Sequence, residues 1–318
     1  MLRRDADSTD ADPTGTDPTD TDLDGRVVLL TGGTSGLGRE AVLALADRGA
    51  SVAVVGRNRE AGRAVRREID ARNGDGWAEC YRVDLASLDA VRDLAAEFRD
   101  RHGRLDALVN NAGVYRTERT ETEDGYETTF AVNHLAPVLL THELLPTLGV
   151  DGREDGPPGR VVVTASGLHR RGDLRFDDLF RAHEYDGRGA YAASKLANVL
   201  FVRELARRLE AEGSDAVALA ADPGFVPSTA LSRSGSLRAR AALDLFSRLP
   251  LPFTNDLGTG ASALVRCVAD TELASDSGTY VAPDGPTDPA DRARDDAVAR
   301  RLWDVSSGLV GVSPDGWV

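Results

Sequence analysis

Lysine is almost absent from this sequence: of its 38 basic residues, 37 are arginine and Lys195 is the one exception. Basic residues as a whole are also outnumbered, because 52 of the 318 residues are Asp or Glu and the formal net charge is −14. Nucleic-acid phosphates require a basic protein face, and anionic membrane surfaces attract basic segments. The composition therefore excludes a nucleic-acid-binding protein and argues against binding to anionic membranes.

Long hydrophobic runs, paired cysteines and spaced histidines are lacking too. No apolar run approaches the ~18–20 residues of a spanning helix, and the start, MLRRDADSTD, has no apolar core of the kind found in secretory signals. Cys80 and Cys267 form no CxxC pattern, and the five histidines show no metal-ligand spacing. We expect a soluble, cytoplasmic protein with neither membrane insertion, nor a disulfide framework, nor a metal site.

Residues 1–23 contain almost nothing that a folded core would bury. They are mostly Asp, Thr, Pro and Gly, and their aspartates repel one another, so this segment cannot offset the entropy cost of ordering. We expect a disordered acidic tail, with a partner-binding segment as the alternative. No second break in composition follows, so residues 24–318 are expected to form one domain.

Beyond the tail, short apolar segments alternate with amphipathic helical patterns. Helices are expected from the first glycine-rich turn to about Arg48, over 59–71, over 88–98 and from Tyr191 onward. The expected strands are 26–30, 51–55, 77–83, 105–109, 160–164, 216–220 and 279–281. Near-continuous apolar strands separated by helices predict an α/β fold: a doubly wound parallel sheet of about seven strands with helices on both faces.

The first expected strand and helix are joined by the sequence TGGTSGLG, residues 31–38. Glycines here let the backbone turn tightly and approach a pyrophosphate at the N-terminus of the helix. The spacing of Gly32, Gly36 and Gly38 differs from the common G-x-G-x-x-G, and a glycine-rich loop without a ligand is the alternative. Its position in the first strand–helix unit favours a dinucleotide cofactor and hence a Rossmann fold.

The end of the second expected strand carries Arg57, in the sequence Val55-Gly56-Arg57-Asn58. An NAD site would place a carboxylate here to bind the ribose hydroxyls. A guanidinium instead pairs with a 2′-phosphate, which a carboxylate would repel. We therefore predict NADP(H) in preference to NAD(H), with an ordinary exposed arginine as the alternative.

Two more expected strands end in residues suited to a ligand. Asp84 and Leu85 follow the third strand, where an adenine would lie, and Asn111, Ala112 and Gly113 follow the fourth. Small residues at a strand end let a ligand or another backbone come close. Ordinary turn chemistry is the alternative, but the shared location at strand ends favours ligand contacts.

Tyr191 and Lys195, in the sequence YAASK, are four residues apart on an expected helix and so project from one face of it. A free phenol has a pKa near ~10 and is a poor acid or base at neutral pH. A nearby ammonium favours the phenolate and is expected to lower the pKa of Tyr191. An accidental surface pair is the alternative.

The order of these motifs resembles that of the short-chain dehydrogenases/reductases. The motifs are TGGTSGLG, NNAG, the Asn133 of FAVNH, Ser166 after RVVVTA, YAASK and Pro223-Gly224. Residues 122–148 and 176–209 are similar to the branch that contains retinol dehydrogenases and light-dependent protochlorophyllide reductases. The resemblance covers roughly residues 25–285.

The resemblance implies a role for each matched residue. Tyr191 would be the general acid of carbonyl reduction or the base of alcohol oxidation, and Lys195 would lower its pKa and contact the nicotinamide ribose. Ser166 would hold the substrate oxygen, and Asn133 would position a water in a proton relay through Lys195. The implied cofactor contacts are Gly32, Ser35, Gly36, Leu37 and Gly38 at the pyrophosphate, and Pro223, Gly224 and Val226 at the nicotinamide.

Two positions depart from the family pattern. Ala165 stands where the family often has a first serine, but Ser166 aligns with the catalytic one. The threonine expected four residues after the Pro-Gly glycine is replaced by Ser228, with Thr229 next. Either hydroxyl could contact the nicotinamide carboxamide.

Two further parts of the sequence are expected to border the substrate. His169, between Ser166 and Tyr191, is a candidate substrate contact, with a plain loop histidine as the alternative. Residues 225–255 are expected to form an amphipathic lid, which suggests a fairly apolar aldehyde, ketone or alcohol; core packing is an equal alternative.

Three functions compete at this stage. The first is an NADP(H)-dependent oxidoreductase acting on a carbonyl/alcohol pair. The others are a catalytically idle NADP(H)-binding sensor and a nucleotide-sugar epimerase or dehydratase with the same Tyr–Lys pair. A sensor needs no intact proton relay, and an epimerase usually has a larger C-terminal domain. Both a monomer and a homo-oligomer are compatible with the sequence.

The excess of acidic over basic residues continues beyond the tail. Through Asp24 the chain has eight Asp and two Arg, a net charge of −6, which leaves −8 for the rest. Such a composition resembles proteins of salt-loving archaea, although Arg-rich, Lys-poor usage also occurs in GC-rich bacterial genomes. Salt screens repulsion between carboxylates. We predict that the melting temperature rises from dilute buffer to molar KCl; a flat or falling curve would contradict this.

Overall fold

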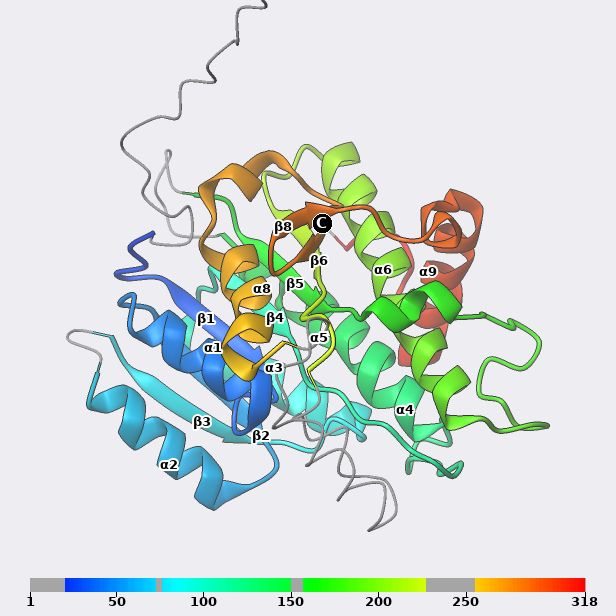
Figure 1. The fold of residues 1–318 in the computed structure, drawn as a ribbon, viewed down its shortest axis with the longest axis horizontal. Coiled ribbons are helices and arrows are strands. Elements are labelled where there is room, and N and C mark those ends of the chain that lie inside the picture. The colour runs from blue at the N-terminus through cyan, green and yellow to red at the C-terminus, as the bar shows by residue number, and fades with distance from the viewer. Residues whose placement is uncertain (1–20, 73–75, 150–156, 227–254, 318) are drawn as a thin grey trace, which may run out of the picture.

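The computed structural model describes residues 21–72, 76–149, 157–226 and 255–317. Within these ranges the chain forms one eight-stranded sheet between two layers of helices (Figure 1). The expected α/β fold with a doubly wound, mostly parallel sheet is confirmed. Most of the expected tail, residues 1–20, and most of the expected lid, residues 227–254, lie outside the described residues, as do Ser228 and Thr229.

The strand order is β3-β2-β1-β4-β5-β6-β7-β8, and all neighbouring pairs are parallel except β7 with β8. The strands are β1 (Val27–Thr31), β2 (Ser51–Gly56), β3 (Ala78–Arg82), β4 (Ala107–Asn110), β5 (Arg160–Thr164), β6 (Val217–Ala221), β7 (Tyr280–Ala282) and β8 (Gly285–Thr287). Strand order reverses between β1 and β4, so the loops that follow these strands diverge. That divergence opens a crevice at the carboxyl edge of the sheet.

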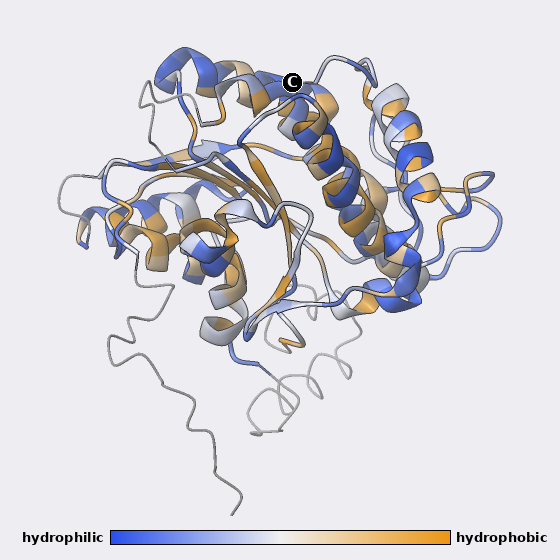
Figure 2. Ribbon diagram, turned by 90° about the horizontal axis from the view of Figure 1, so that it is seen from above, coloured by the Kyte–Doolittle hydropathy of each residue, from blue (hydrophilic) through white to orange (hydrophobic). Residues whose placement is uncertain are grey.

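Helices cover both faces of the sheet, which is why its strands are buried on both sides (Figure 2). The residues of β1 alternate: Leu29 belongs to the core cluster that contains residues of α3, α5, α6 and α9, whereas Val28 and Leu30 belong to the one that contains residues of α1, α2 and α8. The bounds are α1 (Gly36–Ala46), α2 (Arg59–Asp70), α3 (Leu88–His102), α5 (Ala136–Leu144), α6 (Gly187–Ala211), α8 (Leu257–Ala269) and α9 (Asp296–Val310).

One helix contains a wide turn close to the crevice. The short helix α4 (Thr128–Phe130) continues through a π-helical turn, η1 (Ala131–Leu135), directly into α5. A π turn inserts an extra residue into the helical repeat and often marks a functional position. As a result, the consecutive residues Asn133 and His134 are both buried.

The structure corrects three expected boundaries. Leu23, the last residue of the expected tail, is instead buried, and its backbone N–H donates to the carbonyl of Arg48 over 2.8 Å. Helix α3 runs past Phe98 to His102 and ends at Gly103, whose φ of 66° suits glycine. β8 was not expected at all, because a three-residue Gly-Pro-Thr segment carries no strand pattern.

Candidate active site

A cavity of about 710 Å³ lies at the carboxyl edge of the sheet. Residues from the loops after β1, β2, β3, β4, β5 and β6 line it, as does the first part of α6. The lining includes Gly32, Ser35, Gly36, Leu37, Gly38, Arg57, Asp84, Leu85, Asn111, Ala112, Gly113, Ser166, Tyr191, Lys195, Pro223, Gly224 and Val226. The structure thus brings together all the predicted site residues except Asn133, which is not a lining residue.

The glycine-rich loop packs too closely for side chains. Gly32 and Gly36 have positive φ angles of 73° and 56°, and a Cβ on Gly38 would overlap the carbonyl oxygen of Gly32 and lie 2.5 Å from Nδ2 of Asn111. Ser35 precedes α1 in an extended conformation, and its side chain does not cap the helix. The first turn of α1 also contains no acidic residue, so its N–H groups suit an anion.

The loop after β4 is held against the end of β1. Oγ1 of Thr31 accepts from the backbone N–H groups of Asn111 and Ala112, both over 3.0 Å, and Nδ2 of Asn111 donates to the carbonyl of Thr31 over 2.9 Å. The close approach leaves Ala112 Cα only 2.9 Å from where a Cβ on Gly32 would lie. The small residues of NNAG therefore set the floor of the cavity, as their position at a strand end predicts.

Arg57 directly follows β2 and lines the same cavity as Tyr191, which lies on α6. Its side chain is exposed and makes no ion pair with any acid in the described ranges. The neighbouring Asn58 is engaged elsewhere, because its Oδ1 caps α2 by accepting from Glu60 N and Ala61 N. Arg57 is thus the polar side chain at the end of β2 that is available to a ligand.

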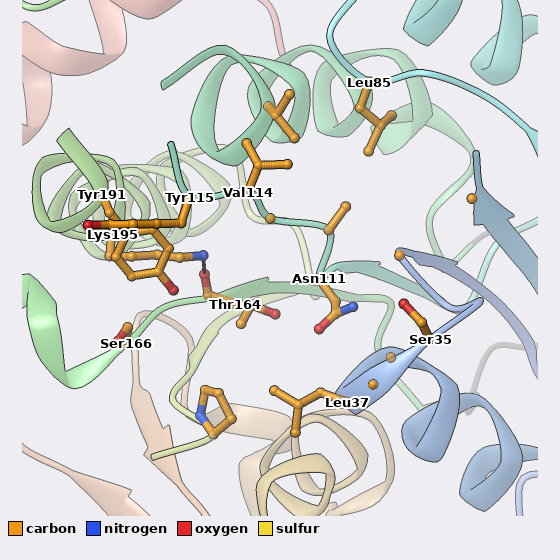
Figure 3. A pocket seen from close by; sticks show the side chains of 18 of the residues that line it. Ser35, Leu37, Leu85, Asn111, Val114, Tyr115, Thr164, Ser166, Tyr191 and Lys195 are labelled. Carbon is orange, nitrogen blue, oxygen red and sulfur yellow. Dashed lines mark hydrogen bonds between the residues drawn. The ribbon is translucent and has the colours of Figure 1, made fainter. Parts of the chain in front are cut away.

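Tyr191, Lys195 and Ser166 meet where β5 ends beside α6 (Figure 3). Tyr191 and Lys195 lie one turn apart on α6 and are 8% and 2% exposed. Lys195 Nζ lies 5.6 Å from the centre of the Tyr191 ring and donates to the carbonyl oxygen of Thr164 over 2.7 Å. The pair is therefore not an accidental surface pair but a fixed, buried one.

The electrostatics of this pair correct one expectation. Burial raises the pKa of Tyr191 above its usual value; the Ser166 side chain acts in the opposite direction, and the charge of Asp222 raises the pKa further. Burial also lowers the pKa of Lys195 to about 8, against the charge of Asp222. The expected lowering of the Tyr191 pKa is not seen, because desolvation outweighs an ammonium that points at Thr164.

Asn133 holds a neighbouring loop with its side chain. Its Oδ1 accepts from Val114 N over 2.7 Å, while its Nδ2 donates to Val114 O and Ser194 Oγ, both over 3.0 Å. A Cβ on Gly113 would lie 3.5 Å from Asn133 Oδ1 and 3.8 Å from Lys195 Nζ. Gly113 thus keeps a small space open between the two side chains.

Several residues near the site were missed or misread from the sequence. His169 is fully buried, with Nδ1 2.7 Å from the carbonyl oxygen of Ser166, so it does not face the cavity. Asn198 was overlooked, although its Nδ2 donates to the same Thr164 carbonyl as Lys195, over 3.1 Å. It lies one turn beyond Lys195 on α6, and this helical spacing is the sequence feature that could have identified Asn198 as part of the site. Asp222 lies directly before Pro223 and is also buried.

Two features are missing from the described ranges. No cluster of three or more His, Cys, Asp or Glu side chains there is arranged to hold a metal ion. No helix there is long and apolar enough to span a membrane.

Comparison with known sequences decides the family. The family model described as short chain dehydrogenase matches residues 26–237. The chain belongs to this family. It is similar to retinol dehydrogenase 14 of Mus musculus, with 37% identity over 300 residues that cover 91% of this chain and 87% of the relative. Polyprenol dehydrogenase of Mus musculus is 39% identical over 287 residues, which cover 90% and 84% of the two chains. The protein is therefore an oxidoreductase.

Solved structures of similar fold include members of the same family. A short chain dehydrogenase from Burkholderia cenocepacia in complex with NADP is 29% identical, with a TM-score of 0.62, covering 82% of this chain and 96% of that one. A protein from Mycobacterium paratuberculosis is 31% identical, with a TM-score of 0.72, covering 92% and 96%.

The geometry of Gly38 leads to a test of the loop in this short-chain dehydrogenase. We expect Gly38→Ala to weaken NADPH binding by at least about tenfold, because the new methyl group would push Gly32 and Asn111 apart. The matched control is Gly308→Ala in α9, where a Cβ meets nothing within 4 Å; it should leave binding unchanged. NADPH fluorescence titration measures both, and equal affinities would contradict the expectation.

Proposed function

We propose that this short-chain dehydrogenase transfers a hydride between NADP(H) and a carbonyl/alcohol pair on a fairly apolar substrate, with Tyr191 as general acid or base. The observation that supports this best is the shared cavity. It joins a glycine-rich loop and Arg57 to a cluster formed by the buried Tyr191 and Lys195 and the half-buried Ser166. A dinucleotide lying along the strand ends would bring its nicotinamide to that cluster.

The residues present fit the cofactor. The crowded turn at Gly32 and Gly38 admits backbone only, which leaves room for a pyrophosphate beside the N-terminus of α1. Leu85 and Asp84 would border the adenine, while Pro223, Gly224 and Val226 would border the nicotinamide. When bound, NADPH supplies the hydride.

In the reducing direction, the chain supplies the proton that balances the hydride. Tyr191 donates its phenolic proton to the substrate oxygen as the hydride reaches the carbon, and Ser166 holds that oxygen by a hydrogen bond. The Lys195 ammonium favours the resulting phenolate. Lys195 then returns a proton through a water in the space that Gly113 leaves between Lys195 and Asn133.

The cofactor preference rests on Arg57. Its exposed guanidinium, without an acidic partner among the described residues, suits a 2′-phosphate. The absence of a carboxylate from Val55-Gly56-Arg57-Asn58 removes the usual partner of the free ribose hydroxyls. The NADP complex of the Burkholderia cenocepacia relative supports the same choice.

Beyond the proposed cofactor contacts the cavity has apolar lining residues as well as the polar Arg116, Thr128 and Arg188. Val114, Tyr115, Val132, Leu168 and Phe225 line it, and Phe225 is 57% exposed. Such a lining favours a hydrophobic chain or ring beside the reacting carbon. The names of the similar proteins, retinol and polyprenol dehydrogenase, support a long apolar alcohol or the matching aldehyde.

The role of Tyr191 has a direct test. Tyr191→Phe should lower kcat for aldehyde reduction by about 10²–10⁴-fold, because the only group lost is the proton donor. The NADPH dissociation constant should stay nearly the same. The matched control is Tyr115→Phe in the same cavity, with its ring centre 6.0 Å from that of Tyr191; it should retain most activity. Substantial turnover by Tyr191→Phe would refute the assignment.

Arg57→Ala tests the cofactor preference. We expect the KM for NADPH to rise by about 10–100-fold while the KM for NADH changes little, since only the phosphate contact is lost. Arg63→Ala, on the exposed side of α2 and outside the cavity lining, serves as the control. The assignment fails if the wild type prefers NADH and the substitution leaves the ratio unchanged.

A further inference from the structure

His134 is a fully buried histidine that the proposed reaction does not use. It lies in the π-helical turn η1, directly after Asn133. Its aromatic neighbours are Phe130 and Phe201, whose ring centres lie 4.9 Å and 6.1 Å from that of His134. In such apolar surroundings a ring nitrogen without a hydrogen bond would be costly. The partners of its two nitrogens therefore need to be accounted for.

The two partners of His134 lie on different helices. Nδ1 is 3.2 Å from Oδ1 of Asn198 on α6, and Nε2 is 2.9 Å from Oγ of Ser306 on α9. Asn198 and Ser306 are themselves buried, so both contacts are shielded from solvent. The imidazole therefore joins the C-terminal helix α9 to the helix that carries Tyr191 and Lys195.

The direction of each hydrogen bond follows from Thr164. Its carbonyl oxygen only accepts, so Nδ2 of Asn198 faces it and donates over 3.1 Å. Oδ1 of Asn198 is thereby turned toward His134, and because this oxygen also only accepts, the ring proton of His134 must be on Nδ1. Burial lowers the pKa of His134 to about 4, so at neutral pH Nε2 carries no proton and accepts from the Ser306 hydroxyl.

This network ends on the acceptor that Lys195 uses. The carbonyl oxygen of Thr164 accepts from Lys195 Nζ over 2.7 Å as well as from Asn198, and Thr164 lines the cavity. If the Asn198 amide were turned over, its oxygen would face the Thr164 oxygen and two acceptors would be opposed. The orientation of Asn198 therefore affects the place of the Lys195 ammonium.

We propose that His134 is a positioning residue for the active site. Its Nδ1–H group holds the Asn198 amide in one orientation, and this amide fixes the Thr164 carbonyl. Ser306 keeps the imidazole in the tautomer that this requires, which makes α9 part of the support of the site. The proposal rests on the function given above, in which Lys195 favours the phenolate and returns a proton. It also gives a reason for a fully paired polar network inside an apolar helical layer.

Two substitutions of His134 separate hydrogen bonding from packing. His134→Phe keeps a buried ring but removes the donor, whereas His134→Asn is smaller and can place an amide N–H where Nδ1 was. We expect kcat for aldehyde reduction to fall about tenfold in His134→Phe and at most about threefold in His134→Asn. A residue that only fills space would give the opposite order, because the smaller side chain leaves a cavity. That order, or a wild-type kcat in His134→Phe, would overturn the proposal.

Two consecutive serines of α9 provide a matched pair for the far end of the network. Ser306 contacts His134, while Ser307 is also buried but its hydroxyl has no hydrogen-bond partner among the described residues. Ser306→Ala should lower kcat about threefold, as for the loss of one neutral hydrogen bond, and Ser307→Ala should leave kcat unchanged. In the His134→Asn background Ser306→Ala should add nothing, because the shorter side chain does not extend to Ser306. Equal effects of the two serine substitutions would contradict the proposal.

Nuclear magnetic resonance of the unsubstituted protein tests the tautomer without substrate or cofactor. With ¹⁵N-labelled histidine, couplings between the ring protons and the ring nitrogens show which nitrogen of each of the five imidazoles carries a proton. We expect His134 to be protonated on Nδ1 alone between pH 6 and pH 8, because burial keeps the ring neutral. A His134 ring protonated on Nε2, or one that becomes charged in this range, would overturn the proposal even if every variant failed to fold.

The single lysine reports the other end of the network. In protein labelled with ¹³C,¹⁵N-lysine, Lys195 is the only labelled side chain. Its signals should move in His134→Phe and stay close to those of the wild type in His134→Asn, since only the first variant loses the bond that orients Asn198. Unmoved Lys195 signals in His134→Phe would refute the proposal. Failure of the proposed function would appear separately, as a wild type with the expected tautomer that reduces no aldehyde.

Discussion

The carbonyl oxygen of Thr164 accepts hydrogen bonds from Lys195 Nζ over 2.7 Å and from Asn198 Nδ2 over 3.1 Å. These bonds join the end of β5 to two successive turns of α6. Because Tyr191 lies on the same face of α6 and Ser166 follows β5 by two residues, the two bonds help to hold Tyr191 and Ser166 in place relative to one another. Asn198 in turn contacts His134, whose other nitrogen contacts Ser306 on α9. The side chains to which we assign catalysis are thus connected to a buried polar network that continues to α9.

This buried polar network gives a reason why lysine and arginine are not interchangeable at position 195. An ammonium is a compact charge that fits against a single carbonyl, whereas a guanidinium is wider and presents five donors in a plane. In a protein that uses arginine for 37 of its 38 basic residues, the one lysine is buried and donates to the carbonyl oxygen of Thr164. Burial also lowers the pKa of Lys195, so its ammonium loses a proton more easily than that of an exposed lysine.

Much of the fold and of the cavity lining follows from sequence. Apart from β3, which reads AECYR, the parallel strands are mainly apolar, and the strand ends carry glycine, asparagine and small residues, so their convergence was predictable. Other features depend on tertiary contacts that leave no local pattern. The burial of Leu23 needs Arg48 beside it, β8 needs β7 as a partner, and the raised pKa of Tyr191 comes from the packing around it. In the sequence Asp222 and His169 look like ordinary loop residues, because their connection depends on Tyr280 of β7, whose hydroxyl contacts both.

The burial of Lys195 also affects how this protein can be handled. Reagents that attack primary amines meet one lysine side chain in the whole sequence, and it is 2% exposed. Acylating labels, aldehyde fixatives and amine-reactive supports would therefore find no readily accessible lysine side chain. Any slow modification of Lys195 would report opening of the active site itself.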